Sequence, residues 1–179
     1  MKRMPWWPLL TRSLALMTTL CACAITAWAQ PLLGEVDPNW REDPVPPPPA
    51  YSTSGLIDIE MPVRSNVKMG LDPDTLVLNQ QTGVVRYVVV ARGPSAINAS
   101  YEGIRCATGE YRVYARQTPG NPWNPSEDED WKPMRGQSGV VVAHPLRLAR
   151  DGLCVGTTLR RTAQDMVREL RTGNRSIYY

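Results

Sequence analysis

Residues 97–116, INASYEGIRCATGEYRVYAR, contain the strongest fold signal in this chain. Two strand-like segments, 97–106 and 110–116, are joined by Ala107-Thr108-Gly109, a short glycine-containing connection typical of a β-hairpin. In the second segment the side chains alternate between two predicted faces, with Tyr111, Val113 and Ala115 on one and Arg112, Tyr114 and Arg116 on the other.

The segments before the hairpin also have strand character. Residues 84–91 are almost entirely apolar, with Arg86 as the only charge, which predicts a central strand covered on both faces. Residues 57–61 alternate apolar and acidic positions, which predicts a half-buried strand. Between them we expect turns at Asp72-Pro73-Asp74 and at residues 80–83, separated by a short strand at 75–78.

The C-terminal region changes from strand to helix periodicity. A stripe of apolar residues predicts an amphipathic helix that is capped by Thr157 or Thr158 and ends at Gly173. A shorter helix is predicted for Pro145–Leu153. The predicted fold is therefore a small, mostly antiparallel sheet with a C-terminal amphipathic helix, of the α+β class, with one disulfide. The stripe consists of Leu159, Ala163, Met166, Val167 and Leu170.

The first 29 residues have the pattern of an export signal. A basic start precedes an uncharged apolar run at 13–25, and Ala27-Trp28-Ala29 provides the small–x–small pattern before a cleavage at Gln30. The run is shorter than the ~20 residues that span a bilayer. We predict a signal peptide at 1–29, a Pro-rich extended arm at 30–54 and a single α+β domain at 55–179, located in the periplasm.

An alternative processing pattern overlaps this signal. Leu20-Cys21-Ala22-Cys23 resembles a lipobox, in which Cys23 would be lipidated. The protein would then be an outer-membrane lipoprotein, tethered through the Pro-rich arm. Membrane association is expected only in this case.

The charge is distributed unevenly along the exported chain. The full sequence has 20 Lys+Arg and 17 Asp+Glu, and removal of Lys2, Arg3 and Arg12 leaves 17 of each. Residues 30–131 have 8 basic and 14 acidic residues, whereas residues 132–179 have 9 and 3. Two solvated surfaces of opposite sign are one interpretation, and a basic face for anionic lipid or an acidic partner is the other. Nucleic-acid binding is not favoured, because the basic region lacks interleaved stacking aromatics.

Two cysteines, Cys106 and Cys154, remain after signal removal. In an oxidising compartment they can form a single intramolecular pair, which would stabilise the fold by about 4 kcal/mol. The absence of a Cys-x-x-Cys motif argues against a thioredoxin-like redox role.

The predicted arm is rich in proline, including the run 46–49, and cannot form a helix or a central strand. Trp40 is the exception within this polar segment. We expect its side chain to pack on its own domain, with a partner protein as the alternative.

Motifs for nucleophilic, metal or cofactor chemistry are weak. His144 is the only histidine, and the run Gly136-Gln137-Ser138-Gly139, which holds the candidate nucleophile Ser138, lacks the spacing of a nucleophile elbow. The acidic run 127–130 could hold calcium loosely but lacks EF-hand spacing, and a solvated loop is expected. We predict no metal and no cofactor, since no phosphate loop, dinucleotide or haem motif is present.

Aromatic, arginine and acidic residues gather in and around the hairpin. Tyr, Trp and Arg dominate binding surfaces, but in a chain without Phe they can equally serve as core residues. Glu102 and Glu110 on neighbouring strands would be the acid–base pair of a hydrolase, or pair with nearby arginines. The candidate binding surface consists of Tyr101, Glu102, Arg105, Tyr111, Tyr114, Trp123 and Trp131.

The run Tyr-Glu-Gly-Ile-Arg-Cys at 101–106, followed by Gly-Glu-Tyr-Arg-Val-Tyr-Ala at 109–115, resembles the signature of the CNP-like family of exported proteobacterial proteins. Asn39-Trp40 before the Pro-rich arm and the late Cys154 agree with this resemblance. It implies one exported domain with paired Cys106 and Cys154, and it implies no catalytic residues.

Three functional hypotheses follow. The first is a non-catalytic binding or structural module of the cell envelope that recognises a protein or an envelope polymer. The second is a small envelope hydrolase that uses Glu102 or Glu110. The third is a lipid-tethered assembly factor anchored at Cys23.

Overall fold

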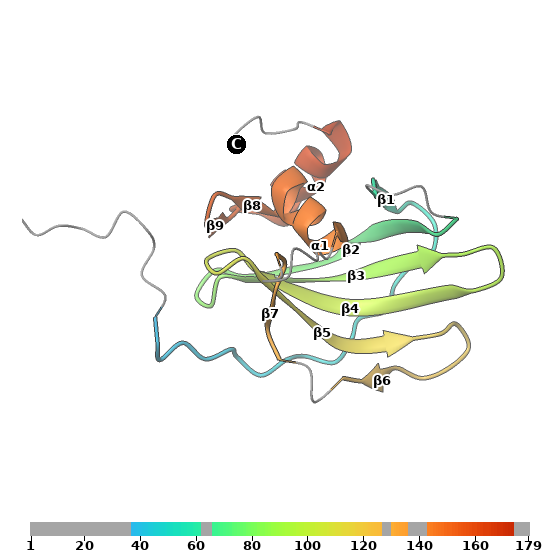
Figure 1. The fold of residues 1–179 in the computed structure, drawn as a ribbon, viewed down its shortest axis with the longest axis horizontal. Coiled ribbons are helices and arrows are strands. Elements are labelled where there is room, and N and C mark those ends of the chain that lie inside the picture. The colour runs from blue at the N-terminus through green and yellow to red at the C-terminus, as the bar shows by residue number, and fades with distance from the viewer. Residues whose placement is uncertain (1–36, 62–65, 127–129, 136–142, 174–179) are drawn as a thin grey trace, which may run out of the picture. The chain divides into compact units, whose positions relative to one another are not determined.

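The computed structural model describes residues 37–61, 66–126, 130–135 and 143–173 (Figure 1). All of these residues belong to one unit of the chain, residues 33–179. The predicted signal peptide, Cys21 and Cys23 lie outside the described residues, as do the first residues of the arm, most of the acidic run 127–130, and Ser138.

An antiparallel sheet is the centre of the fold, as predicted. Strands β1 to β6 follow one another across the sheet in chain order, and β7 pairs with β5 next to β6. The strands of this sheet in the described ranges are β1 (Ile57–Ile59), β2 (Lys68–Asn79), β3 (Val84–Arg92), β4 (Ile97–Arg105), β5 (Glu110–Gln117), β6 (Asn124–Pro125) and β7 (Lys132–Pro133). The edge beyond β5 is thus closed by two short, proline-containing strands, which discourages pairing with another chain.

The turn expected at Asp72-Pro73-Asp74 is wrong, because β2 continues through it. Between the pairs Asp72–Val88 and Val77–Arg86, β2 advances five residues while β3 advances two, so the strand bulges. Pro73 cannot donate to the ladder. The Thr75 hydroxyl accepts from the Val88 N–H at 2.8 Å, so this backbone donor of β3 has a partner within the bulge.

The central strand and the hairpin are confirmed. The first seven residues of β3 are buried, and β4 pairs with β5 from Ala99 to Arg105. The predicted alternation in β5 is only partly right. Tyr101 pairs with Ala115 and Glu102 with Val113, so Tyr114 is an extra residue in a bulge, and Ala115 moves to the face of Tyr114.

Both predicted helical regions are present. The shorter one consists of α1 (Ala143–Leu148) and the π-helix η1 (Ala149–Leu153). The C-terminal helix, α2 (Ala163–Thr172), ends at Gly173 in the left-handed conformation, as expected. Its predicted start is wrong: Thr162 is the cap, because Leu159 belongs to a small hairpin of β8 (Cys154–Val155) and β9 (Thr158–Leu159).

The two faces of the sheet are covered differently (Figure 1). The helices and the β8–β9 hairpin lie over one face, which we call the helix face, where Tyr87, Ile104 and Met166 share a core. The arm lies along the other face, the arm face, where Tyr101, Tyr114 and Val88 form a second core. The fold is therefore α+β, with the sheet between an apolar helical layer and an extended segment.

The predicted disulfide is present between Cys106, at the end of β4, and Cys154 in β8. The Cα atoms are 5.8 Å apart, and the bond closes a sequence separation of 48 residues. It ties the β8–β9 hairpin to the β4–β5 turn. None of the helices in the part of the chain that is described has the length and apolar composition of a membrane span.

Candidate functional site

The seven residues predicted as a binding surface are divided by the sheet. Tyr101, Glu102, Arg105 and Tyr114 are buried, with at most 9% exposure. Tyr111 belongs to the helix face, while Trp123 packs on the arm face. Tyr111, Trp123 and Trp131 are half-buried. The core interpretation therefore accounts for four members, and a role for the half-buried aromatics in binding stays a prediction.

Glu42, a residue of the arm, is the centre of the arm face. Its side chain is only 8% exposed and forms an ion pair with Arg86, which is 4% exposed. It also accepts hydrogen bonds from Tyr114 Oη at 2.6 Å and from Arg112 Nη1 at 3.3 Å. This network of Glu42, Arg86, Arg112 and Tyr114 attaches the arm to two strands of the sheet, β3 and β5.

Burial and charge shift the pKa values of two members of this network. Burial raises the pKa of Tyr114, and its hydrogen bond to Glu42 raises it further. Burial alone would lower the pKa of Arg86, but the interactions with Glu42 and Tyr114 outweigh this effect and raise it. The phenol therefore stays neutral and the guanidinium charged.

Trp40 packs on its own domain, as expected. The Arg105 guanidinium lies 3.8 Å from the centre of its ring, and Trp131 meets it edge-on at 5.9 Å. Its indole N–H donates to the carbonyl of Thr82 at 2.9 Å. A guanidinium over an indole face is a favourable cation–π contact. Trp40 and Glu42, two positions apart, thus attach the same short stretch of the arm.

Gly103 in the signature run makes room for this network. A Cβ atom at this position would lie 2.4 Å from the Tyr114 hydroxyl and 2.9 Å from its ring. Only glycine leaves space for the tyrosine to cross β4 and reach Glu42. The signature Tyr-Glu-Gly-Ile-Arg-Cys is therefore explained to a large extent by packing of the arm and by the disulfide.

Glu102 and His144 form a second polar contact, on the helix face. His144 Nε2 lies 2.9 Å from Glu102 Oε2, and the Ser100 hydroxyl donates to Glu102 Oε1. Glu102 is 2% exposed. Tyr87, its neighbour across the strands, is fully buried, and burial raises its pKa well above the ordinary value, with the Glu102 charge adding to the shift. The only histidine is therefore held against a buried carboxylate.

Glu102 and Glu110 do not form a pair. Glu102 is opposite Val113 in the ladder, and Glu110 lies three positions from Val113 on the same strand, so it faces the other side of the sheet. Glu110 instead accepts a hydrogen bond from Thr108 and lies 3.9 Å from Arg105. The geometry does not bring two carboxylates to one substrate. Among the described residues no cluster of His, Cys, Asp and Glu could hold a metal ion.

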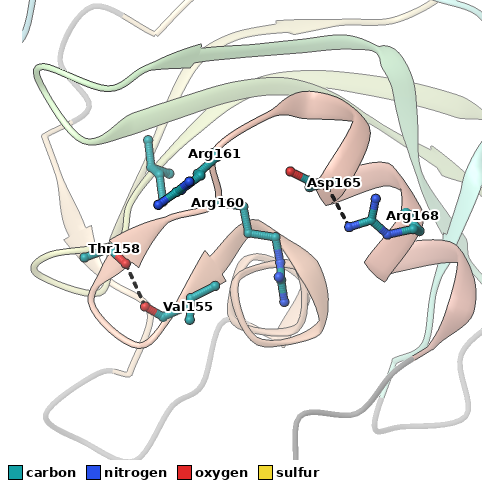
Figure 2. Close-up of a pocket in the computed structure, with 7 residues that line it drawn as sticks. Val155, Thr158, Arg160, Arg161, Asp165 and Arg168 are labelled. Carbon is teal, nitrogen blue, oxygen red and sulfur yellow. Dashed lines mark hydrogen bonds and ion pairs between the residues drawn. The ribbon is translucent and has the colours of Figure 1, made fainter.

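A pocket between the β8–β9 hairpin and α2 was not predicted from the sequence (Figure 2). Its volume is about 380 Å³. The excess of basic residues after position 131 was the only sequence signal that pointed to this region. Side-chain periodicity could not predict that the β8–β9 hairpin and α2 would form a pocket together. The lining residues are Val155, Thr158, Leu159, Arg160, Arg161, Asp165 and Arg168.

The fold and these contacts define a class of protein: a disulfide-bonded α+β domain whose Pro-rich arm is fixed across the sheet by buried charges and stacked aromatics. The profile of the CNP1-like family matches residues 35–171, from the arm to the last turn of α2. The chain belongs to the CNP1-like family. No curated protein and no solved structure matches it.

Proposed function

We propose that this protein is a non-catalytic binding module of the cell envelope, exported to the periplasm. The observation that carries the proposal is that the ionisable residues in and around the hairpin are occupied by internal contacts. Glu42 and Glu102 are buried against Arg86 and His144, respectively. A catalytic acid or base needs access to its substrate, and these groups are used to hold the fold together.

The disulfide supports an exported location. Cys106 and Cys154 form a disulfide that is largely removed from solvent. Such bonds persist in oxidising compartments and are rare in the cytosol. The proposal includes cleavage before Gln30, and lipidation at Cys23 is its alternative.

Trp123 is the best-placed aromatic residue for recognition. It is half-buried, packs edge-on against Tyr51 at 5.6 Å, and lies on the arm face just before β6. Tyr114, by contrast, is committed to Glu42. A partner protein or an envelope polymer would meet the Trp123–Tyr51 pair at the edge of the sheet.

The test compares Trp123→Ala with Glu110→Gln in the full-length protein in its native cells. Proteins and polymers cross-linked to each variant in intact envelopes would be compared with those of the wild type. We expect Trp123→Ala to lose the cross-linked species and Glu110→Gln to retain it. Retention in Trp123→Ala together with loss in Glu110→Gln would contradict the proposal and favour the hydrolase hypothesis. Val77→Ala, at an exposed position on β2, is the matched apolar control.

The cellular location has its own measurement. An intact mass of the protein from the envelope, before and after reduction and alkylation, should show a chain that starts at Gln30 with no free thiol. A diacylglyceryl-modified Cys23 would contradict the soluble form and turn the Pro-rich arm into a membrane tether.

A further inference from the structure

The pocket between the β8–β9 hairpin and α2 has an excess of positive charge. Three guanidinium groups, those of Arg160, Arg161 and Arg168, face it together with one carboxylate, Asp165 (Figure 2). It lies in the C-terminal region with 9 basic and 3 acidic residues. The binding module proposed above would find here a site for an anion, and this inference rests on that proposal.

The three guanidinium groups differ in the hydrogen bonds and ion pairs that they already form within the protein. Arg160 donates Nε to the carbonyl of Gly152 at 2.7 Å and lies 3.7 Å from Glu169. Arg168 pairs with Asp165 at 2.6 Å and more loosely with Glu169. Arg161 is exposed and has no side-chain partner among the described residues. Two carboxylates thus serve three guanidiniums, and one positive charge remains uncompensated.

Asp165 is held in its charged form. Hydrogen bonds from Thr162 and Arg168 lower its pKa. Thr162 caps the start of α2, because its hydroxyl accepts from the Asp165 N–H, and the Asp165 carboxylate accepts hydrogen bonds from this hydroxyl and from Arg168. An anion in the pocket would therefore meet Arg161 first, and Arg160 and Arg168 as fixed neighbours.

The backbone around the pocket is fixed before any ligand binds. The Gln80 amide donates to the carbonyls of Arg160 at 3.0 Å and Arg161 at 3.2 Å, so the loop before α2 is tied to the end of β2. The Arg160 N–H donates to the Leu153 carbonyl. Cys154 anchors the hairpin through the disulfide. Such preorganisation reduces the entropy that a ligand must overcome.

The donor set favours one ligand chemistry. Guanidinium groups bind carboxylate and phosphate through paired N–H donors. Carboxylates of the protein already meet two of the arginines, and a phosphomonoester adds a second negative charge and a third oxygen. The volume suits a small molecule, and the exposed side chain of Val155 lies at the rim as an apolar contact. We infer that this pocket binds a phosphate group, carried either by a soluble molecule or by a lipid headgroup.

The experiment uses the mature, oxidised protein and compares Arg161→Gln with Arg171→Gln. Arg171 is an exposed arginine in the last turn of α2 and does not line the pocket. Pyrophosphate and succinate would be titrated by calorimetry, and phosphatidylcholine vesicles with and without phosphatidic acid by co-sedimentation. Thermal melting would confirm that both variants fold.

We expect saturable binding of pyrophosphate, or of vesicles only when they contain phosphatidic acid, and the arm that responds identifies the source. Arg161→Gln should weaken that binding at least about tenfold, the effect of losing hydrogen bonds to a charged group. Arg171→Gln should leave it unchanged. The inference is overturned if neither probe binds saturably, if succinate binds as tightly as pyrophosphate, or if both variants weaken binding equally. Those results would not bear on the proposed binding module, which the cross-linking experiment with Trp123→Ala tests separately.

Discussion

The arm face and the helix face of the sheet are held by different forces. On the helix face, apolar side chains of α1, η1 and α2 pack on Tyr87, Val89 and Ile104, and a disulfide adds a covalent tie. On the arm face, a Pro-rich segment that has no helix or strand in its described residues 37–54 is attached by Glu42 and Trp40. Helices bury a continuous apolar stripe, whereas an extended arm has few apolar residues and depends on specific polar anchors.

The largest expected effect is on the arm face. Glu42→Ala leaves Arg86 buried without its carboxylate, and breaking a buried ion pair in this way costs about 3–5 kcal/mol. Urea unfolding followed by circular dichroism would measure the free energy of unfolding. Limited proteolysis should show earlier cleavage within residues 43–54 if the arm is released.

Asp43→Ala is the matched control for this comparison. Asp43 is the next residue, also acidic, but exposed, with a side-chain hydrogen bond to Asn79. Its loss should cost less than about 1 kcal/mol. Equal losses for Glu42→Ala and Asp43→Ala would show that the buried network does not hold the arm.

The second effect belongs to the helix face. Replacing Cys106 and Cys154 together by serine should lower the free energy of unfolding by about 2–4 kcal/mol, since the bond closes a long loop. Hydrogen exchange should quicken in η1 and in the β8–β9 hairpin, while the Trp40 indole N–H on the arm face keeps its protection. Equal acceleration on both faces would contradict the separation of the two layers.

The third effect is a loss of folding stability at alkaline pH. The pKa values of Tyr87, Tyr101 and Tyr114 are raised, in each case first by burial. The unfolded chain loses these protons near pH 10 while the folded protein keeps them, so the folded state binds more protons and stability falls as pH rises through 10. Below pH 10 this contribution is fully present. Melting temperatures between neutral pH and pH 11 would measure the slope.

Two tyrosine variants, one on each face of the sheet, test which tyrosines cause this loss of stability at alkaline pH. Tyr87 on the helix face has a buried hydroxyl without a hydrogen-bond partner in the described part of the chain, so Tyr87→Phe should cost little at neutral pH. Tyr114→Phe removes the hydrogen bond to Glu42 and should cost about 1.5–3 kcal/mol. Both should flatten the alkaline slope. If Tyr87→Phe lost more unfolding free energy at neutral pH than Tyr114→Phe, the hydrogen bond of Tyr114 to Glu42 would not be the stronger tyrosine contact, and the prediction would be contradicted.

Local patterns were sufficient where one segment determines its own structure. The alternation in residues 57–61, the apolar run of β3 and the Gly-containing turn of the β4–β5 hairpin all predicted strands that are observed, although β1 ends at Ile59, two residues earlier than expected. The cap of α2 was misplaced because Thr157, Thr158 and Thr162 all suit a helix start, and only the pairing of β8 with β9 selects the last. The two bulges were missed because each depends on a partner strand: Thr75 on Val88, and Tyr114 on Gly103.

The candidate site shows the same division. The sequence predicted which residue types gather around the hairpin, and that Cys106 pairs with Cys154. It could not tell that Glu42 reaches Arg86, 44 positions later, or that Arg160, Arg161 and Arg168 face one pocket. Nor could it tell that Glu102 and Glu110 are separated by the sheet, since the face of each residue follows from strand register.

The sequence by itself determined the antiparallel sheet, the C-terminal amphipathic helix, the disulfide and the family. The sheet, the helix and the disulfide follow from side-chain periodicity, turn chemistry and cysteine count, which act over a few residues or leave a single choice, and the family follows from the resemblance of the signature at residues 101–115. The tertiary structure alone decided where the arm attaches, which carboxylates are buried and which arginines line one pocket. Those outcomes depend on free energies between residues far apart in the chain, which no local pattern contains.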